Sequence, residues 1–177
     1  MGSVLGYRDE LIKAMAMLAR DDRVIFLGQC VAYPGSAIYG TLEKVPKSQR
    51  LELPVAEDMQ LGMSTGLSLE GYIPVSIFPR LDFLILAANQ LVNHLDKIEE
   101  MSCGQWKPKV IIRTMVGSVK PLYPGPQHCQ DHTEALRCLV TNIDVVKLTE
   151  SKQIVPAYRT ALKSERSTIL IEVADLY

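Results

Sequence analysis

Val24-Ile25-Phe26-Leu27-Gly28 is a short run of β-favouring residues that ends at a glycine. The side chains of residues 24–27 are all apolar, so both faces of the strand that they predict would be buried. Burial on both faces is typical of a strand inside a parallel sheet, because helices cover both sides of such a sheet. The run therefore predicts a central strand of a parallel sheet.

Helical and strand-like stretches alternate outward from this strand. Leu11, Met15 and Leu18 recur at helical spacing in a helix expected from about Tyr7 to Ala19. Further helices are expected at residues 57–69, 81–97, 133–139 and 154–163, strands at 74–77, 110–112, 144–148 and 169–173, and loops at 29–50 and 115–132. This alternation predicts an α/β fold, a doubly wound, mainly parallel sheet with helices on both faces, in a single domain spanning residues 1–177.

The bulk composition is that of a folded domain. Of the 177 residues 47% are apolar, the formal net charge is −1, and the pI is near 6.3. A near-neutral chain argues against nucleic acid or an anionic membrane surface as the main partner. No apolar run approaches the ~20 residues of a membrane-spanning helix.

The cysteines and the first residues bear on the compartment. The four cysteines form no C-x-x-C pair and match no zinc module. The start of the chain lacks the basic and then apolar pattern of a signal peptide. These features predict reduced thiols in a cytoplasmic protein.

Several motifs of self-contained enzymes are missing from the sequence. No G-x-G-x-x-G follows the first strand and no G-x-x-x-x-G-K-[ST] occurs, so no dinucleotide or nucleotide phosphate site is indicated. H-E-x-x-H is also absent, and the histidines are only His94, His128 and His132. This pattern argues against a self-contained hydrolase or metalloenzyme and favours isolated acids whose function another chain completes.

Three segments, in a shared order and spacing, resemble a known family. They are Leu53-Pro54-Val55-Ala56-Glu57-Asp58-Met59-Gln60-Leu61-Gly62 with Glu70-Gly71-Tyr72-Ile73-Pro74-Val75, then Asp82-Phe83 through Met101-Ser102-Cys103-Gly104-Gln105 to Ile112-Arg113, and Gln127-His128-Cys129-Gln130. The end of the chain, Thr168 to Glu172 and Leu176-Tyr177, fits as well. The chain resembles the β subunit of the E1 component of 2-oxo acid dehydrogenases, and more broadly the pyrimidine-binding domain shared with transketolases.

The resemblance implies a thiamine diphosphate enzyme in which Glu57 is catalytic and binds the cofactor. The family's matching glutamate hydrogen-bonds to N1′ of the aminopyrimidine ring, which helps the 4′-amino group to remove the C2 proton of the thiazolium. A buried carboxyl suits this task, because desolvation favours its neutral, proton-donating form. From the residues alone, Glu57 could instead be an acid at a helix N-terminus that the helix dipole stabilises, a role that Asp58 also fits.

Other candidate residues come from the same resemblance. Phe83 matches an aromatic that packs against the aminopyrimidine, and its alternative is a core position at the start of a helix. His128 matches a histidine at the substrate end of the site, where an imidazole could transfer protons or hold a carboxylate; its alternative is a surface loop. Cys129 shows no activating base or charge that would make it a nucleophile. Gln90 and Asn93 are expected to hold helix and subunit contacts.

The sequence departs from the family at the cofactor and substrate positions. It ends at Tyr177, where the family continues into a second domain, so membership of a large dehydrogenase complex does not carry over. Gln29-Cys30 replaces the family's Glu-Asp after the first strand, and the loop before His128 is not glycine-rich, so the family's substrates do not carry over either.

No Gly-Asp-Gly followed by a distant asparagine occurs, the motif that supplies oxygen ligands to the metal and diphosphate in this family. The resemblance therefore implies a separate diphosphate-binding, E1 α-like chain. That chain would hold most of the Mg²⁺, and the two chains would share thiamine diphosphate at their interface. Two-fold symmetry makes an α2β2 heterotetramer the natural assembly.

Three functions remain open on the sequence. The first is a catalytic subunit of a split thiamine diphosphate enzyme that acts on a 2-oxo acid or ketose, by decarboxylation or C–C bond transfer. The second is transketolase-like ketol transfer between sugars; phosphorylated sugars would need basic loop residues, and Arg80 and Lys120 are the obvious ones. The third is a non-catalytic scaffold or regulatory partner.

Exposed apolar surface would mark the face that another chain covers. No methionine stripe indicates a cofactor site, and the methionines are expected to serve in packing. Those concerned are Met15, Met17, Met59, Met63 and Met101.

Overall fold

The computed structural model describes residues 6–120 and 123–177, and its centre is a six-stranded sheet in the order β2-β1-β3-β4-β6-β5. Every neighbouring pair of strands in this sheet is parallel. The strands are β1 (Val24–Gly28), β2 (Arg50–Glu52), β3 (Ile73–Ile77), β4 (Ile111–Val116), β5 (Asp144–Lys147) and β6 (Thr168–Val173). The fold class expected from the sequence is confirmed. The residues at the start of the chain that bear on a signal peptide, and Pro121 and Leu122 of the expected loop, lie outside the described residues.

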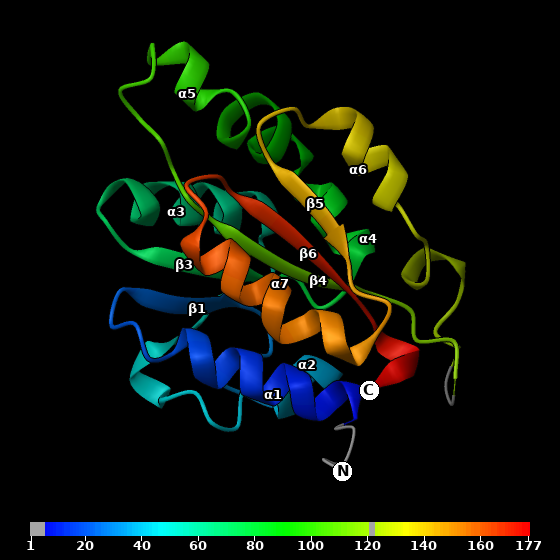
Figure 1. Cartoon of the computed structure of the whole chain (residues 1–177). Helices are drawn as coiled ribbons and strands as arrows, with labels where there is room; N and C mark the ends of the chain where they lie inside the picture. Colours follow the sequence, from blue (N-terminus) through cyan, green and yellow to red (C-terminus); the bar gives the residue numbers. More distant parts are fainter. Residues whose placement is uncertain (1–5, 121–122) are drawn as a thin grey trace.

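Helices cover both faces of the sheet (Figure 1). On one face α1 (Tyr7–Leu18) and α7 (Ser151–Lys163) lie side by side, with the short α2 (Ala37–Thr41) next to α1. The other face is covered by α3 (Glu57–Leu69), by the helical stretch that begins with α4 (Leu81–Leu84), and by α6 (Thr133–Leu139). The remaining turns are α5 (Ile98–Met101), η1 (Lys47–Gln49), η4 (Pro126–His128) and η5 (Ala174–Leu176).

Side chains alternate between two cores along the central strands. In β4, Ile111 belongs to the core under α1 and α7, whereas Ile112 belongs to the core under α3, α4 and α6. In β6, Leu170 and Ile171 divide in the same way. This alternation explains why the central strands are apolar at consecutive positions, since each face of the sheet has its own buried layer.

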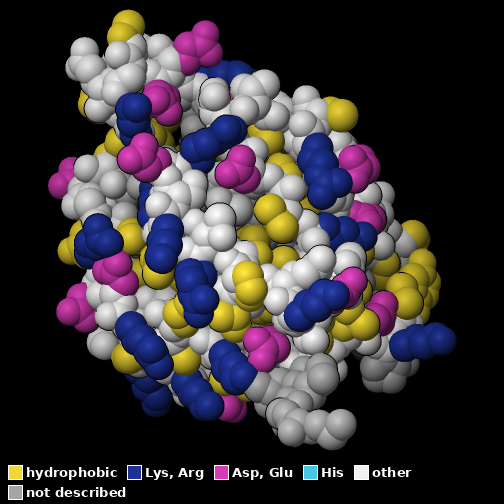
Figure 2. Space-filling view, in the orientation of Figure 1, with side chains coloured by type: hydrophobic (Ala, Val, Ile, Leu, Met, Phe, Trp, Pro, Cys, Tyr) yellow, Lys and Arg dark blue, Asp and Glu magenta, His cyan; other side chains and the backbone are white. Residues whose placement is uncertain are grey.

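The outer face of α1 and α7 carries charged side chains of both signs (Figure 2). Interspersed charges of this kind are typical of a solvated helix face, and they agree with the formal net charge of −1. Among the helices of the described residues, none is long and apolar enough to cross a bilayer.

The expected loop at residues 29–50 is wrong in part, because it contains α2 and η1 and leads into the edge strand β2. β2 is only three residues long, and it includes Arg50 and Glu52. Such a strand lacks an apolar alternation, and pairing with β1 is what makes it a strand. Tertiary contacts here override local propensity.

The expected helix at residues 81–97 is helical but is not one regular α-helix. α4 is followed by the 3-10 turn η2 (Ile85–Ala87) and the π-helical turns of η3 (Gln90–Leu95). The tighter 3-10 turn places Ala87 on the buried side, whereas Ala88 is only partly buried. The expected loop at residues 115–132 also differs, because β4 extends to Val116 and η4 adds one helical turn.

A fully buried ion pair joins β4 to β6. Arg113 donates to Glu172 through Nε at 2.8 Å and Nη2 at 3.0 Å, and both side chains are 0% exposed. The hydroxyl groups of Tyr158 and Tyr177 also donate to the Glu172 carboxylate. Burial, and then the negative charge of Glu172, raise the pKa of both tyrosines well above the usual value. Helix α7 and the end of the described chain are thereby tied to the sheet.

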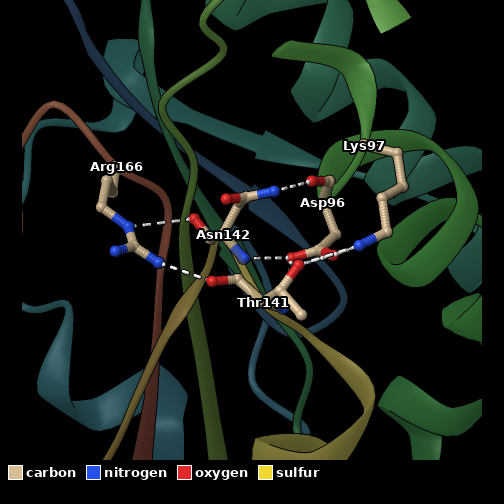
Figure 3. Close-up of polar contacts among 5 residues, drawn as sticks. All are labelled: Asp96, Lys97, Thr141, Asn142 and Arg166. Carbon is tan, nitrogen blue, oxygen red and sulfur yellow. Dashed lines mark hydrogen bonds and ion pairs between the residues drawn. The ribbon is translucent and has the colours of Figure 1, made fainter. Parts of the chain in front are cut away.

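A second buried carboxylate, that of Asp96, holds the turn that leads into β5, near the amino ends of β5 and β6 (Figure 3). Asp96 accepts hydrogen bonds from the backbone N–H groups of Thr141 at 2.9 Å and Asn142 at 2.7 Å, and an ion pair from Lys97 at 2.8 Å. Arg166 caps the same turn by donating to the carbonyls of Thr141 and Asn142. Burial alone would raise the pKa of Asp96, but these hydrogen bonds outweigh it and lower the pKa.

Arg113→Met should lower the free energy of unfolding by about 3–5 kcal/mol, because it leaves the buried Glu172 carboxylate without its counter-charge. Urea denaturation of the whole chain measures this change. The matched control is Arg159→Met at an exposed position of α7, where a change within about 0.5 kcal/mol is expected. An Arg113→Met protein as stable as the wild type would contradict the role of the ion pair.

Stability should fall at alkaline pH. Tyr158 and Tyr177 have folded-state pKa values raised above the ordinary 10.0, so above that pH the unfolded chain loses protons that the folded chain keeps. The free energy of unfolding should then fall by about 1.4 kcal/mol per pH unit for each tyrosine. Urea denaturation over a pH series measures the slope. Tyr158→Phe should reduce it by one tyrosine's share, whereas Tyr33→Phe, at a side chain that is 68% exposed, should not change it.

Candidate active site

The order of the strands creates a crevice at the carboxyl end of β1. The chain leaves β1 for β2 on one side and then crosses back to β3 on the other side. The segments that follow β1 and β3 therefore diverge, and such a switch point is where parallel α/β sheets bind ligands. A cleft of about 610 Å³ lies there. It is lined by Gln29, Cys30, Gly35, Ser36, Ala37, Val55, Glu57, Pro79, Arg80, Phe83, Leu86, Met115, Ser118 and Ala174.

Glu57 lies in this cleft as the first residue of α3. Its side chain is only 6% exposed, and no described residue donates a hydrogen bond to its carboxyl group. The carboxyl group faces the cleft, where a ligand could supply a contact that the described residues do not. Glu57 begins α3 and also faces the cleft. Its position is therefore compatible both with an acid at a helix N-terminus and with a carboxyl that binds a ligand.

A chain of buried amides positions the first turn of α3. Gln60 donates through Nε2 to the Ser76 hydroxyl at 3.1 Å and to the Ile77 carbonyl at 2.9 Å, and it accepts from Gln29 at 2.9 Å. These bonds join β1, α3 and β3 one helical turn from Glu57. The sequence analysis missed Gln60, although its place on the buried side of the helix, three residues after Glu57, was a usable signal.

Gly28 permits the close approach of β1 and β3 at this point. Its φ is +140°, and a Cβ atom on it would lie 2.2 Å from the Ile77 carbonyl oxygen. No other residue fits without moving the backbone. Gly28, the last residue of β1, is therefore required for the backbone to form this wall of the cleft.

Glu52 anchors the loop that follows β1. Its carboxylate accepts backbone N–H bonds from Cys30 at 2.7 Å, Val31 at 2.8 Å and Ala32 at 2.7 Å. Cys30 is held there in the left-handed region with a φ of 58°. The sequence analysis missed Glu52, because nothing in its spacing connects it to residues about twenty positions earlier.

Phe83 and His128 meet edge to face beside the cleft. Their ring centroids are 5.6 Å apart and their planes are at 90°. Phe83 comes from α4 and lines the cleft, whereas His128 comes from η4, is half-buried, and packs behind Phe83 without lining the cleft. The structure thus brings the three predicted site residues to one edge of the sheet, with Glu57 and Phe83 on the cleft surface.

Arg80 is what holds the His128 segment in place. Its Nη1 group donates to the Gly117 carbonyl at 2.6 Å and to the His128 carbonyl at 2.7 Å. These two bonds connect the end of β3 to both ends of the loop after β4. Arg80 also lines the cleft, so one side chain both supports the loop and forms part of the wall.

The other residues considered in the sequence have mainly local contacts. Gln90 donates to Asp58 at 3.4 Å and so connects η3 to α3. Asn93 donates to Asn89 at 3.0 Å. The Cys129 thiol, which is half-buried, donates to the Ser118 carbonyl at 3.5 Å. Within residues 6–120 and 123–177, no group of three His, Cys, Asp or Glu side chains could hold a metal ion.

A second hollow of about 540 Å³ lies around α5, away from the carboxyl ends of the strands. It is lined by His94, Ile98, Met101, Ser102, Cys103, Gln105 and Trp106. None of the predicted site residues lines it. We therefore assign the candidate site to the cleft at the switch point.

An apolar ridge runs along the outer side of α3, beside the cleft. It consists of Val55, Met59, Met63 and Leu86, which are 78%, 43%, 37% and 63% exposed. The expectation that the methionines are packed is confirmed for Met15, which is fully buried, and for Met17, which packs against the same core. It is wrong for Met59, Met63 and the 71% exposed Met101. A contiguous apolar ridge of this kind is typical of a surface that another chain covers.

The sequence profile described as "Transketolase, pyrimidine binding domain" matches residues 6–177. The chain belongs to this family. The resemblance drawn from the motifs is therefore confirmed, and in this pyrimidine binding domain the matched region takes in Glu57, Phe83 and His128.

Curated relatives of this pyrimidine binding domain are E1 β subunits. The 2-oxoisovalerate dehydrogenase subunit beta of Bacillus subtilis is 26% identical over 150 residues, which are 82% of this chain and 44% of the relative. The pyruvate dehydrogenase E1 component subunit beta-4, chloroplastic, of Oryza sativa is 28% identical over 173 residues, 96% of this chain and 42% of the relative. The chain thus spans less than half the length of these relatives.

Solved structures share the fold of this pyrimidine binding domain. A split-gene transketolase, described as an inactive β4 tetramer, aligns over 94% of this chain and 50% of its own with a TM-score of 0.64 and 17% identity. The transketolase of Campylobacter jejuni aligns over 96% of this chain and 26% of its own with a TM-score of 0.71 and 15% identity. At these identities the likeness establishes the fold alone.

Glu52→Ala should release the loop after β1. The charge-assisted bonds to the backbone of residues 30–32 are each worth roughly 1.5–3 kcal/mol, so amide hydrogen exchange there should accelerate by roughly tenfold or more. Exchange in β3 should stay slow. The matched control is Glu43→Ala at an exposed position. Unchanged exchange at residues 30–32 would show that Glu52 does not hold the loop.

Proposed function

We propose that this chain is the aminopyrimidine-binding subunit of a split thiamine diphosphate enzyme, with Glu57 as the residue that exchanges a proton with the ring. One observation carries the proposal: a buried carboxyl without a protein partner faces a cleft at the switch point of a parallel sheet. The family supports it, because the chain matches the transketolase pyrimidine binding domain over residues 6–177.

The cleft fits a flat, mainly apolar heterocycle with one polar edge. Its volume of about 610 Å³ lies within the ~300–1,000 Å³ typical of small-molecule sites. Phe83 offers an aromatic surface on one wall, and Glu57 offers the proton-sharing group. When bound, thiamine diphosphate supplies a nucleophilic carbon that adds to the substrate carbonyl. The residues of this chain would hold and polarise its aminopyrimidine end.

Most of the Glu57 side chain is enclosed, and its carboxyl group faces the cleft in which the ring would lie. With 6% of the side chain exposed, few water molecules compete for the carboxyl group, and electrostatic interactions are stronger than in bulk solvent. The amide chain through Gln60 keeps the first turn of α3 in place. Phe83, backed by His128, restricts the ring to one plane. His128, which does not line the cleft, would support Phe83 through their edge-to-face contact.

The diphosphate and Mg²⁺ would belong to a second chain. The described residues provide no cluster of acidic or histidine ligands, and the cleft lining holds a single cationic side chain. The ridge of Val55, Met59, Met63 and Leu86 is the surface that we propose the second chain covers, closing the cleft from outside. An E1 α-like chain in an α2β2 heterotetramer fits this arrangement.

A 2-oxo acid is the proposed substrate class, with decarboxylation or C–C bond transfer as the reaction. The curated relatives named above are dehydrogenase subunits for pyruvate and 2-oxoisovalerate, which supports this class over a ketose.

Titration of the ¹⁵N-labelled chain with the hydroxymethyl aminopyrimidine fragment of thiamine tests the proposal without the second chain. Weak binding, on the order of millimolar, is expected, with shifts at the backbone amides of Glu57 and Phe83. Glu57→Ala should weaken it roughly tenfold, because the proton-sharing bond is lost. Glu57→Gln, which retains a weaker donor, should fall in between.

Glu43→Ala is the matched control and should bind the fragment like the wild type. If Glu57→Ala also bound like the wild type, the assignment of the proton-sharing residue would be wrong. Shifts centred on Trp106 would place the ligand in the hollow around α5 and reject the cleft.

A further inference from the structure

Two charged side chains line the cleft, Glu57 and Arg80. Arg80 is half-buried, and no carboxylate of a described residue lies within ion-pair distance of it. Its two hydrogen-bond acceptors, the carbonyls of Gly117 and His128, are uncharged. Glu57 makes no ion pair with Arg80, so the guanidinium has no charged partner among the described residues and could bind an anion.

Only part of the Arg80 guanidinium is used. Both bonds come from Nη1, and the N–H groups of Nε and Nη2 have no acceptor among the described residues. A guanidinium has five N–H donors in a planar fork, and the Nε and Nη2 edge matches the two oxygens of a carboxylate. The Nη1 bonds fix the plane of the group, so little side-chain entropy is left to lose when an anion binds.

Another arginine of this chain, Arg113, shows how the Nε and Nη2 edge of a guanidinium binds a carboxylate. Arg113 uses Nε at 2.8 Å and Nη2 at 3.0 Å to hold the two carboxylate oxygens of Glu172. Arg80 presents the corresponding edge without a protein carboxylate. The difference between the two arginines is that Arg113 is inside the core and Arg80 lines an open cleft.

We propose that Arg80 recognises the carboxylate of the substrate, a small 2-oxo acid, through its Nε and Nη2 edge; this rests on the proposed function. The carboxylate would sit in the cleft that also holds Glu57. A sugar phosphate offers the same oxyanion chemistry. A carboxylate fits better because Arg80 is the one cation among the described lining residues, and a phosphate dianion would leave charge uncompensated.

Titration of the full chain with pyruvate, and separately with inorganic phosphate, tests the assignment at constant ionic strength. The reporter is the Nε–H signal of Arg80 in the NMR spectrum. Pyruvate should shift this signal saturably and phosphate should bind more weakly. Arg80→Lys should weaken pyruvate binding by roughly tenfold, because an ammonium keeps the charge and loses the two-point edge. Arg159→Lys, at an exposed position, should leave binding unchanged.

A second measurement uses only the wild-type chain, so a loop loosened by substitution of Arg80 cannot affect its result. Phenylglyoxal modifies arginines of the wild-type chain, and peptide mass spectrometry follows Arg80 and Arg159 together. Pyruvate should protect Arg80 and leave Arg159 reactive. Absence of protection, an unshifted Arg80 signal, or tighter binding of phosphate than of pyruvate would each overturn the assignment of a carboxylate to Arg80.

The two proposals fail in different ways. If the aminopyrimidine fragment shifts Glu57 and Phe83 but pyruvate leaves Arg80 unaffected, only the Arg80 assignment is wrong. If the fragment does not bind in the cleft, the proposed function fails and the Arg80 assignment fails with it.

Discussion

All six strands of this sheet run in one direction, and most of the structure follows from that constraint. A parallel sheet needs helices on both faces, which accounts for the two cores. It also places every carboxyl end at the same edge, so loops far apart in sequence meet there. Because β1 lies between β2 and β3, the loops diverge at one point, and the cleft with Glu57, Phe83 and Arg80 forms at that point.

The charged side chains inside the sheet and those in the cleft differ in their hydrogen-bond partners. In the core, Arg113 and Glu172 satisfy one another, and at the amino ends of β5 and β6 Asp96 is surrounded by donors. In the cleft, no described residue donates a hydrogen bond to the Glu57 carboxyl, and none accepts one from the Nε and Nη2 edge of Arg80. Both groups line the cleft, so a ligand there could supply the contacts that the described residues do not.

The exposed apolar ridge lies next to the cleft, and it is the surface that we propose a second chain covers. Val55 and Leu86 belong both to the ridge and to the cleft lining, so a partner that covered the ridge would also enclose the ligand. This continuity would let the proposed second chain close the site. Enclosure would also remove water from around Glu57 and Arg80 and strengthen the interactions of both.

The sequence by itself determined the fold class, the helix that begins at Glu57, and the identity of the candidate residues, because apolar periodicity and motif order are local properties. It did not yield β2, the 3-10 and π turns after α4, or the exposure of Met59 and Met63, since pairing and packing between distant segments set these. Only the tertiary structure decided that Glu52 holds the loop at residues 30–32, that Arg80 connects β3 to the loop at 117–128, and that Phe83 meets His128. The physical reason is that hydrogen bonds and ring contacts across twenty or more residues depend on strand order, which no local pattern encodes.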